Sequence, residues 1–364
     1  MTETNLVLEI NRTELETPRL VEESLPALAP GQVRFRIERF ALTANTVTYA
    51  VTGDVLGYWA FFPGPDPAWG RVPAMGWAQV VASNHPDVEP GGRFFGWYPM
   101  ARYVDMAVTP VADGLRDDGG HRAAHAPVYR AYVDTHKDPL YRPGAEAEDR
   151  HALLRGLFIT GWLAEDFFAD HDWFGATRVL VLSASSKTAI AFAQCADERE
   201  GIEVIGVTSP RNHAFTHGVG CYDEVVTYED IPAVPAAAPI VVIDMSGSGP
   251  VLAAVHSHFD AQLKYSMAVG RSHHEAPSRD DDRLAGPRPT FFFAPSQVKK
   301  RLQDWGPRGY QQRVAAALEQ FVDRSHDWLS VEHLAGGAAA VTAWREAHAG
   351  RVSPAVGHVV TLWD

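Results

Sequence analysis

Short apolar runs alternate with helix-period segments in the middle of the chain. Residues 178–183 and 203–208 are two such runs, rich in β-branched residues. Between them lie a turn of small residues at 184–187 and a helix-period segment at 188–197. This order predicts a β-α-β unit, in which a helix joins two parallel strands.

The same alternation continues toward the C-terminus, and a different pattern precedes it. We expect further strands at residues 223–227, 239–245, 263–269, 290–293 and 357–362, and helices at 153–168, 250–259, 295–304 and 310–324. Residues 1 to about 120 contain short strands at 6–10, 32–40, 77–82 and 103–108, punctuated by Pro and Gly. These strands predict a small barrel. Residues 113–150 are polar and irregular, which favours a solvated insertion.

Small hydroxyl side chains follow the strand at 178–183. A dinucleotide pyrophosphate needs backbone N–H groups at a helix N-terminus and little side-chain bulk, so glycines usually stand there. Here Ser185 and Ser186 take that place, with Lys187 beside them. The turn fails to match G-x-G-x-x-G, but serine hydroxyls can cap the helix and donate to a phosphate, and Lys187 adds a positive charge. We therefore predict a phosphate site.

The end of the second strand distinguishes between cofactors. An acidic residue there would hold the ribose hydroxyls of NAD, whereas an arginine would bind the extra phosphate of NADP. The strand ends at Thr208, and Ser209 and Arg211 follow without a carboxylate. We interpret these three residues as a 2′-phosphate clamp. The alternative is a polar surface turn that contains an arginine.

Two later turns would lie at the carboxyl edge of a parallel sheet, where cofactors bind. They are residues 246–249 and residues 270–274, which include Gly270, Arg271 and His273. His273 could donate a proton or bind a phosphate or a substrate carboxylate. The alternative is that it belongs to a polar loop running through residues 279–282.

A dense aromatic cluster follows the strand at 32–40. Residues 44–49 read Ala-Asn-Thr-Val-Thr-Tyr, and Tyr58, Trp59 and two phenylalanines come soon after. Aromatic side chains beside a polar stretch could line a ligand cleft. They could equally form the core of the β-rich domain.

Composition limits the class of protein. The 364 residues are enough for two domains, and no apolar run approaches 18 residues. A net charge of -13 disfavours nucleic acid and anionic membranes as partners. Two cysteines, Cys195 and Cys221, cannot form a disulfide framework or a four-thiolate zinc site. The acidic N-terminus shows no basic, apolar leader, so we expect a cytoplasmic protein.

Two segments of the chain bear on metal binding. His121, His125 and His136 have no recognisable ligand spacing, and a solvated insertion is favoured over a metal site. The second segment is residues 73–78, which read Pro-Ala-Met-Gly-Trp-Ala. They resemble a segment that reads Gly-His-Glu in the family named next.

That family is the medium-chain dehydrogenase/reductase superfamily, on its zinc-independent, quinone-oxidoreductase-like side. The chain resembles it at residues 26–33, 40–45, 73–78, 90–94, 222–226 and 243–247. Trp77 and Ala78 stand where zinc-dependent relatives carry a ligand histidine and its acidic neighbour, so the resemblance implies no catalytic zinc. A Ser-Ser-Lys-Thr turn, an Arg-Ser-His-His loop and Phe-Phe-Ala-Pro at 292–295 are similar to a bacterial branch without an assigned substrate.

The resemblance implies an α/β fold in two domains. One is a Rossmann-type, doubly wound parallel sheet of residues 151–289. The other is a β-rich, GroES-like, partly open barrel made of residues 1–150 and 290–364. A homodimer is the family's usual assembly.

The resemblance also implies a function: an NADPH-dependent, metal-independent reductase that transfers hydride to an activated alkene, a quinone or a related small carbonyl compound. The cofactor residues would be Ser185, Ser186, Lys187, Thr188, Thr208, Ser209, Arg211, Asp244, Ser246, Gly270 and Arg271. Tyr49 would return a proton and Asn45 would orient the acceptor oxygen, while Tyr58, Trp59 and His273 would face the substrate. Two alternatives stay open: an NADP(H)-binding sensor or carrier without turnover, and a family member that no longer binds dinucleotide.

Overall fold

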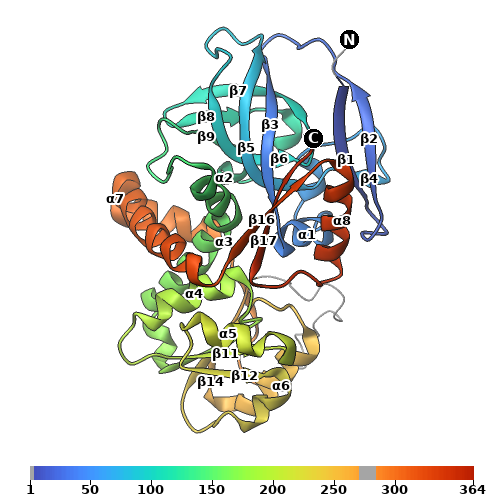
Figure 1. Cartoon of the computed structure of the whole chain (residues 1–364). Helices are drawn as coiled ribbons and strands as arrows, with labels where there is room; N and C mark the ends of the chain where they lie inside the picture. Colours follow the sequence, from blue (N-terminus) through green and yellow to red (C-terminus); the bar gives the residue numbers. More distant parts are fainter. Residues whose placement is uncertain (1–3, 270–283) are drawn as a thin grey trace. The chain divides into compact units, whose positions relative to one another are not determined.

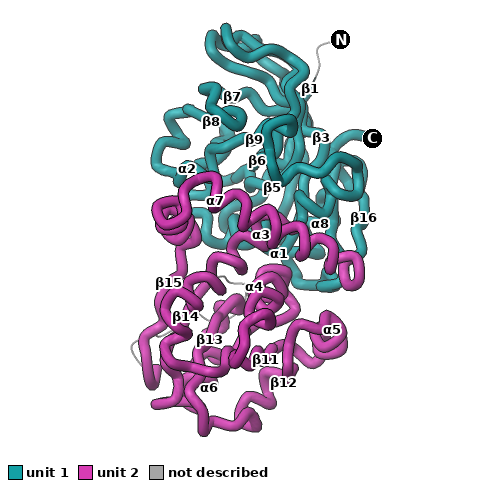
Figure 2. Tube along the Cα trace, turned by 90° about the vertical axis from the view of Figure 1, so that its left-hand side faces the viewer, with its two compact units in different colours: residues 1–153, 330–364 teal, residues 154–329 magenta. Residues whose placement is uncertain are grey.

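The computed structural model describes residues 4–269 and 284–364, and the chain divides into two compact units. Unit 1 consists of Met1–Leu153 and Ser330–Asp364, and unit 2 of Leu154–Leu329. Figure 2 colours the two units separately. The first boundary lies close to the expected residue 150, whereas the chain returns to unit 1 later than the expected residue 290.

Unit 2 contains a six-stranded parallel sheet in the order β12-β11-β10-β13-β14-β15, of which β11, β12 and β14 are labelled in Figure 1. Numbered along the chain, this is the order 3-2-1-4-5-6 of a Rossmann sheet. The strands are β10 (Arg178–Leu182), β11 (Glu203–Thr208), β12 (Glu224–Thr227), β13 (Ile240–Asp244), β14 (Leu263–Ala268) and β15 (Thr290–Phe291). The predicted β-α-β unit and doubly wound sheet are confirmed.

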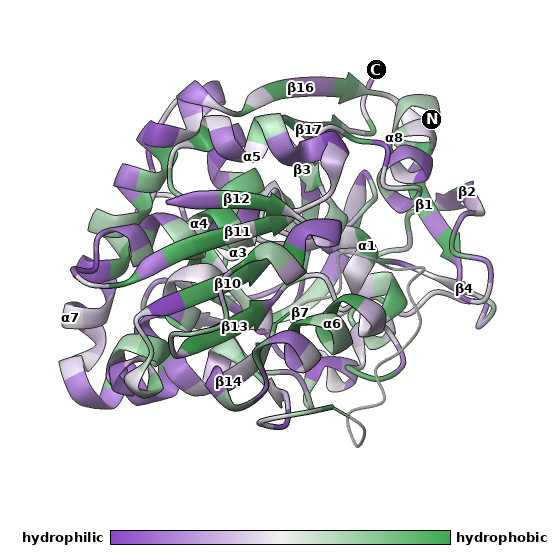
Figure 3. Ribbon diagram, turned by 90° about the horizontal axis from the view of Figure 1, so that it is seen from below, coloured by the Kyte–Doolittle hydropathy of each residue, from purple (hydrophilic) through white to green (hydrophobic). Residues whose placement is uncertain are grey.

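The central strands of this sheet are buried along their whole length, which explains their unbroken apolar sequence. Every residue of β10 and β13 is buried, and both strands are predominantly hydrophobic in Figure 3. A parallel strand covered on both faces has no polar side to show in its sequence. The helices of unit 2 are α3 (Ala145–Asp170, which begins before the unit boundary), α4 (Lys187–Asp197), α5 (His213–Val219), α6 (Gly249–Phe259) and α7 (Ala294–Arg324).

Helix α7 combines the two helices expected at 295–304 and 310–324. The backbone leaves helical geometry at Gly306, where φ is 71°, and Pro307 follows. Proline removes a backbone donor and clashes with the preceding turn, so the helix kinks there.

Unit 1 contains a closed ring of six strands in the order β3-β5-β6-β9-β8-β7, which the β3–β7 pairing completes. Strands β17 and β16 continue the sheet from β3, and β1, β2 and β4 form a separate three-stranded sheet. The strands are β1 (Thr4–Asn11), β2 (Pro18–Ser24), β3 (Gln32–Leu42), β4 (Trp69–Gly70), β5 (Pro73–Ser83), β6 (Arg93–Pro99), β7 (Tyr103–Val111), β8 (Gly114–Asp117), β9 (Ala131–Asp134), β16 (Ser330–Ala335) and β17 (Val356–Thr361). Its helices are α1 (Ala44–Val51), α2 (Pro127–Arg130) and α8 (Gly337–His348). The predicted barrel is confirmed.

The expectation of a solvated insertion at 113–150 is wrong. This segment supplies β8 and β9, which are part of the barrel wall. The segment has a polar sequence although part of it is buried, because buried polar side chains pair with each other. Asp117 and Arg122 are buried, and Arg122 Nε lies 3.5 Å from Asp117 Oδ2. His121 and His136 are exposed.

Candidate functional site

The turn after β10 begins with a residue in the left-handed region. Ser183 has φ 58°, a conformation that costs an L-residue about 1–2 kcal/mol and that glycine adopts freely. Ser186 then caps α4, because its Oγ accepts a hydrogen bond from Ala189 N at 3.3 Å. The turn therefore begins with a left-handed residue and ends in a helix cap although it contains no glycine.

The loop after β11 lies beside this turn. Strands β10 and β11 are paired as far as Leu182 and Val207, so both segments leave the sheet at its carboxyl edge. Asn212 Nδ2 donates to Ser185 Oγ at 3.1 Å, which joins the two segments directly. Thr208 is buried at the strand end, and Arg211, next to Asn212 in the chain, is exposed. The turn that contains Ser185 and Ser186, which we call the serine turn, thus lies next to the predicted clamp.

Two residues that sequence reasoning missed hold the turn in place. Tyr222 Oη donates to Ala184 O at 2.8 Å, and its ring lies so close to β11 that a Cβ on Gly206 would be 2.9 Å from it. The Tyr228 hydroxyl hydrogen-bonds Ser183, and burial raises the pKa of Tyr228 well above its ordinary value. Tyr222 begins the segment 222–226 that resembles the family, but nothing in that segment marks its hydroxyl as a contact to the turn, and Tyr228 lies outside the segments that resemble the family.

Lys187 is the first residue of α4 and is half-buried. Burial lowers the pKa of its ammonium group from 10.5 to about 8. A partly desolvated lysine at a helix N-terminus gains from an anion placed there. Thr188 follows it and is also half-buried.

Asp244 and Ser246 form a closed turn after β13. Asp244 Oδ1 accepts hydrogen bonds from Ser246 N at 2.8 Å, Ser246 Oγ at 2.6 Å and Gly247 N at 3.0 Å. Strand β13 neighbours β10, and the order of the strands reverses between these two. The turn therefore lies at the switch point of the sheet. Gly270, Arg271 and His273 lie outside the described residues.

In unit 1, Tyr49 and Asn45 lie one turn apart on the same face of α1. The Asn45 side chain hydrogen-bonds the Tyr49 hydroxyl, and Trp97 Nε1 lies 3.4 Å from Tyr49 Oη. Burial raises the pKa of Tyr49 well above its ordinary value. The structure therefore places Asn45 and Tyr49 together, and it adds Trp97 from β6.

A second pair of tyrosines lies against Tyr49. The Tyr58 ring meets the Tyr49 ring edge to face at 4.8 Å, and Tyr58 Oη lies 3.3 Å from Tyr129 Oη. Burial raises the pKa of Tyr58 to about 12. Arg122 donates to the backbone carbonyl of Tyr129 and thereby anchors α2. The cluster thus includes Tyr129, which comes from the segment expected to be solvated.

Trp59 has a different environment. Its ring fills space left by two glycines, because a Cβ on Gly53 or Gly70 would lie 2.3 Å or 2.2 Å from it. The guanidinium of Arg12 lies 5.5 Å from the ring centroid. This placement fits a packing role for Trp59 rather than contact with a substrate.

Trp77, which the resemblance sets in the place of a zinc-ligand histidine, is a core side chain. Trp77 is fully buried, and its Nε1 donates to Glu148 O at 3.1 Å. Within residues 4–269 and 284–364, no three His, Cys, Asp or Glu side chains are grouped so that they could hold a metal ion. In the same part of the chain, no helix is long and apolar enough to cross a membrane.

Several solved proteins have a fold similar to this one over almost the whole chain. CurA from Vibrio vulnificus has a TM-score of 0.63 at 16% identity, covering 100% of this chain and 99% of CurA. Mycobacterial Rv1454c, solved with NADPH, has a TM-score of 0.57 at 14% identity, and the match covers 98% of this chain and 99% of Rv1454c. The CurK enoyl reductase has a TM-score of 0.55 at 14% identity, covering 99% of each chain. The expected fold, a Rossmann-type sheet with a GroES-like barrel, is confirmed.

No curated protein matches the sequence. A family model does, over residues 40–353. This match includes α1, the serine turn and α7, and so spans both candidate sites. The chain belongs to the family described as "Protein of unknown function (DUF2855)".

Proposed function

We propose that the protein is an NADPH-dependent, metal-independent reductase that transfers hydride to an activated alkene, a quinone or a related small carbonyl compound. The observation that carries the proposal is the hydrogen bond between Asn212 and Ser185. It places the turn that would bind the pyrophosphate next to the loop that would bind the 2′-phosphate.

The fold neighbours support the choice of cofactor and acceptor. CurA has also been solved in complex with NADPH, as has the mycobacterial protein, and CurK is titled an enoyl reductase. On this chain, the pyrophosphate would be held by Ser185, Ser186, Lys187 and Thr188. The 2′-phosphate would be held by Thr208, Ser209 and Arg211, and the nicotinamide ribose would lie near Asp244 and Ser246.

Tyr49 is the proposed proton donor. When bound, the nicotinamide supplies the hydride, and the acceptor then needs a hydrogen-bond donor for its developing oxyanion and a proton. Because burial raises its pKa, Tyr49 keeps its proton throughout the neutral pH range. Asn45 would orient the acceptor oxygen with its amide N–H group, and Trp97 fixes the Tyr49 hydroxyl.

Cofactor binding can be tested by quenching of the fluorescence of the ten tryptophans. We expect NADPH to bind more tightly than NADH, and Arg211→Ala to weaken NADPH about tenfold or more without changing NADH, since it removes a charge-assisted contact. Arg308→Ala, at another exposed arginine of unit 2, is the control. Equal affinity of the wild type for both nucleotides would refute the clamp.

Turnover is tested by NADPH consumption with a panel of enones and quinones. Tyr49→Phe should lower kcat by about 10²-fold or more if Tyr49 is the general acid. Tyr98→Phe is the matched control, because Tyr98 is also buried in unit 1 and donates to a backbone carbonyl, Phe94 O, at 3.2 Å. Unchanged kcat in Tyr49→Phe would remove Tyr49 from the mechanism. NADPH binding without consumption across the panel would favour the sensor or carrier instead.

The homodimer and the cytoplasmic location stay predictions.

A further inference from the structure

The proposed proton donor lies between two side chains that share a third neighbour. Trp97 Nε1 lies 3.4 Å from the Tyr49 hydroxyl, and the rings of Tyr58 and Tyr49 meet edge to face with centroids 4.8 Å apart. Tyr129, from α2, contacts both side chains. Its ring meets the Trp97 ring edge to face at 5.3 Å, and its hydroxyl oxygen lies 3.3 Å from that of Tyr58.

The donors to Tyr49 matter because its hydroxyl has to release a proton in a buried place. In the proposed reaction the acceptor becomes negatively charged when it receives hydride. The Tyr49 O–H bond then breaks, the proton goes to the acceptor, and the phenolate left on Tyr49 takes a proton back from solvent. Burial raises the pKa of Tyr49, whereas hydrogen bonds from Trp97 and Asn45 lower it. Displacing Trp97 would therefore slow the proton transfer.

The orientation of the Trp97 indole depends on a neighbouring ring. Trp97 is half-buried on β6, and its backbone carbonyl accepts a hydrogen bond from Tyr132 Oη at 2.7 Å. That bond holds the main chain, but the indole can still turn about its side-chain torsions. The Tyr129 ring stands at 81° to the indole and limits this rotation. It thereby fixes the direction of the Trp97 N–H group.

The hydroxyl of Tyr129 restrains the other neighbour. Burial raises the pKa of Tyr58 to about 12 and that of Tyr129 well above its ordinary value. Both phenols therefore keep their protons at neutral pH, and one can donate to the other. Because the Tyr58 ring lies against the Tyr49 ring, this hydrogen bond also restrains Tyr49.

Tyr129 is itself anchored by a buried guanidinium. Helix α2 has only four residues and needs tertiary contacts to be stable. Arg122 is fully buried and donates to two backbone carbonyls, Tyr129 O and, at 3.2 Å, Phe61 O. These carbonyls belong to the segments that carry Tyr129 and Tyr58, so one side chain ties the two segments together.

We propose that Tyr129 is a positioning residue that aligns the Tyr49 hydroxyl for proton transfer. Its ring holds Trp97 and its hydroxyl holds Tyr58. This role rests on the proposed reductase function, and Tyr129 acts on the acceptor only through Tyr49.

Steady-state kinetics with NADPH and an acceptor that the wild type reduces test this role. Tyr129→Phe keeps the ring and removes the hydroxyl, so it should lower kcat about three- to tenfold. Tyr129→Leu removes both contacts and should lower kcat about 10²-fold, because a small misplacement of a catalytic group has an effect of this size. The Kd of NADPH should stay the same in both variants, which also shows that they are folded.

Isotope effects distinguish positioning from a loss of stability. If proton transfer from Tyr49 slows, the solvent isotope effect on kcat should rise. The isotope effect of NADPH deuterated at the transferred hydride should fall, since hydride transfer then limits the rate less. A merely destabilised variant has fewer active molecules and changes neither value. Unchanged isotope effects in both Tyr129 variants, with or without a lower kcat, would overturn the proposal.

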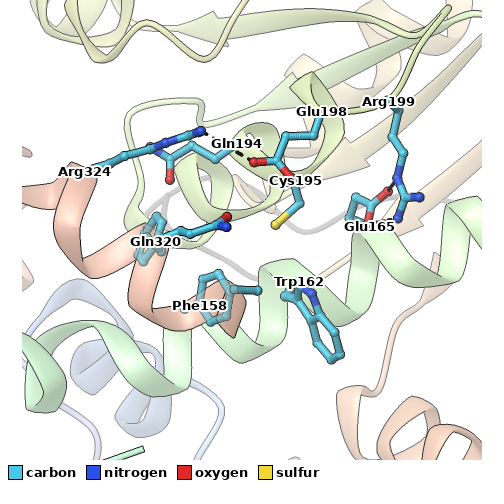
Figure 4. Close-up of a pocket in the computed structure, with 11 residues that line it drawn as sticks. Phe158, Trp162, Glu165, Gln194, Cys195, Glu198, Arg199, Gln320 and Arg324 are labelled. Atoms are coloured by element: carbon cyan, nitrogen blue, oxygen red, sulfur yellow. Dashed lines mark hydrogen bonds and ion pairs between the residues drawn. The ribbon is translucent and has the colours of Figure 1, made fainter. Parts of the chain in front are cut away.

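Two variants serve as controls. Tyr98→Phe removes a buried hydroxyl of unit 1 that donates to Phe94 O. Gln320→Ala changes an exposed residue of unit 2, which lines a pocket between α3, α4 and α7 (Figure 4). Neither should alter kcat or the isotope effects. The proposal would also be overturned if Tyr98→Phe altered them as much as Tyr129→Phe does.

The proposed function and the role of Tyr129 can fail separately. If the wild type consumes no NADPH with any acceptor, or if Tyr49→Phe is as fast as the wild type, the mechanism is refuted and the role of Tyr129 with it. If Tyr49→Phe is slow but Tyr129→Leu equals the wild type, only the role of Tyr129 is refuted.

Discussion

At the scale of single residues, Lys187 has a consequence for the stability of unit 2. It occupies the helix end where relatives of this fold use glycine backbone, and it is half-buried. Desolvation disfavours its charged form and lowers its pKa to about 8. Its desolvation therefore lowers the free energy of unfolding, and an anion at this helix end would favour its charged form.

The stability of the protein should depend on pH because of Lys187. Its folded-state pKa is about 8 and its ordinary pKa is 10.5. Between these values the unfolded chain binds more protons than the folded one, so the free energy of unfolding rises with pH. Below pH 8 the full desolvation cost is present. Relative to Lys187→Met, the wild type should gain stability between pH 7.5 and 10 as measured by urea denaturation.

A lysine outside this environment provides the comparison. Lys299 is exposed on α7, and Lys299→Met should show no such difference from the wild type across the same pH range. A flat difference between the wild type and Lys187→Met would show that Lys187 is well solvated.

At the scale of elements, a glycine sets the distance between α3 and α4. A Cβ on Gly161 would lie 2.6 Å from Thr188 O and 2.8 Å from Phe192 N. Both atoms belong to the backbone of α4, so they cannot move without moving the helix. The packing of α3 thereby fixes the position of the helix that begins at the serine turn.

Gly161→Ala should lower the free energy of unfolding by about 1–3 kcal/mol, because overpacking between two backbones strains both helices. Gly218→Ala is the matched control in another helix, α5, where a Cβ would meet nothing within 4 Å. It should raise stability by about 0.5–1 kcal/mol through lower entropy of the unfolded chain. Urea denaturation measures both, and a loss of stability in Gly218→Ala equal to that in Gly161→Ala would contradict the contact argument.

At the scale of the whole molecule, the chain leaves unit 1 at Leu153 and returns to it at Ser330. All described residues of the proposed nucleotide site belong to unit 2, whereas Asn45, Tyr49 and Tyr58 belong to unit 1. The proposed cofactor residues and the proposed proton donor thus belong to different units of one chain.

Hydrogen exchange should reveal this division. At about 100 times its Kd, NADPH should stabilise the folded state by roughly 2.7 kcal/mol. We expect slower exchange in unit 2 peptides that cover residues 183–189 and 208–212, and a smaller effect with NADH at the same concentration. Slower exchange confined to the three-stranded sheet β2-β1-β4 would contradict the assignment.

Much of this architecture could be predicted from local patterns. The strands of unit 2 were recognisable because a parallel strand buried on both faces requires an unbroken apolar run, as in β10 and β13. The serine turn was recognisable because a strand, a turn and a helix follow each other directly. Strands β8 and β9 were missed, since the ion pair of Asp117 with Arg122 makes a buried segment look polar.

The sequence by itself determined the β-α-β unit of unit 2, the helix-capping Ser186 and the absence of glycine from the turn, because these depend on neighbours in the chain. Only the tertiary structure decided which distant residues complete each site: Asn212 beside Ser185, Trp97 beside Tyr49 and Tyr129 beside Tyr58. The physical reason is that these contacts depend on sheet pairing and on burial. Both bring together residues up to 71 positions apart, and neither leaves a periodic trace in the sequence.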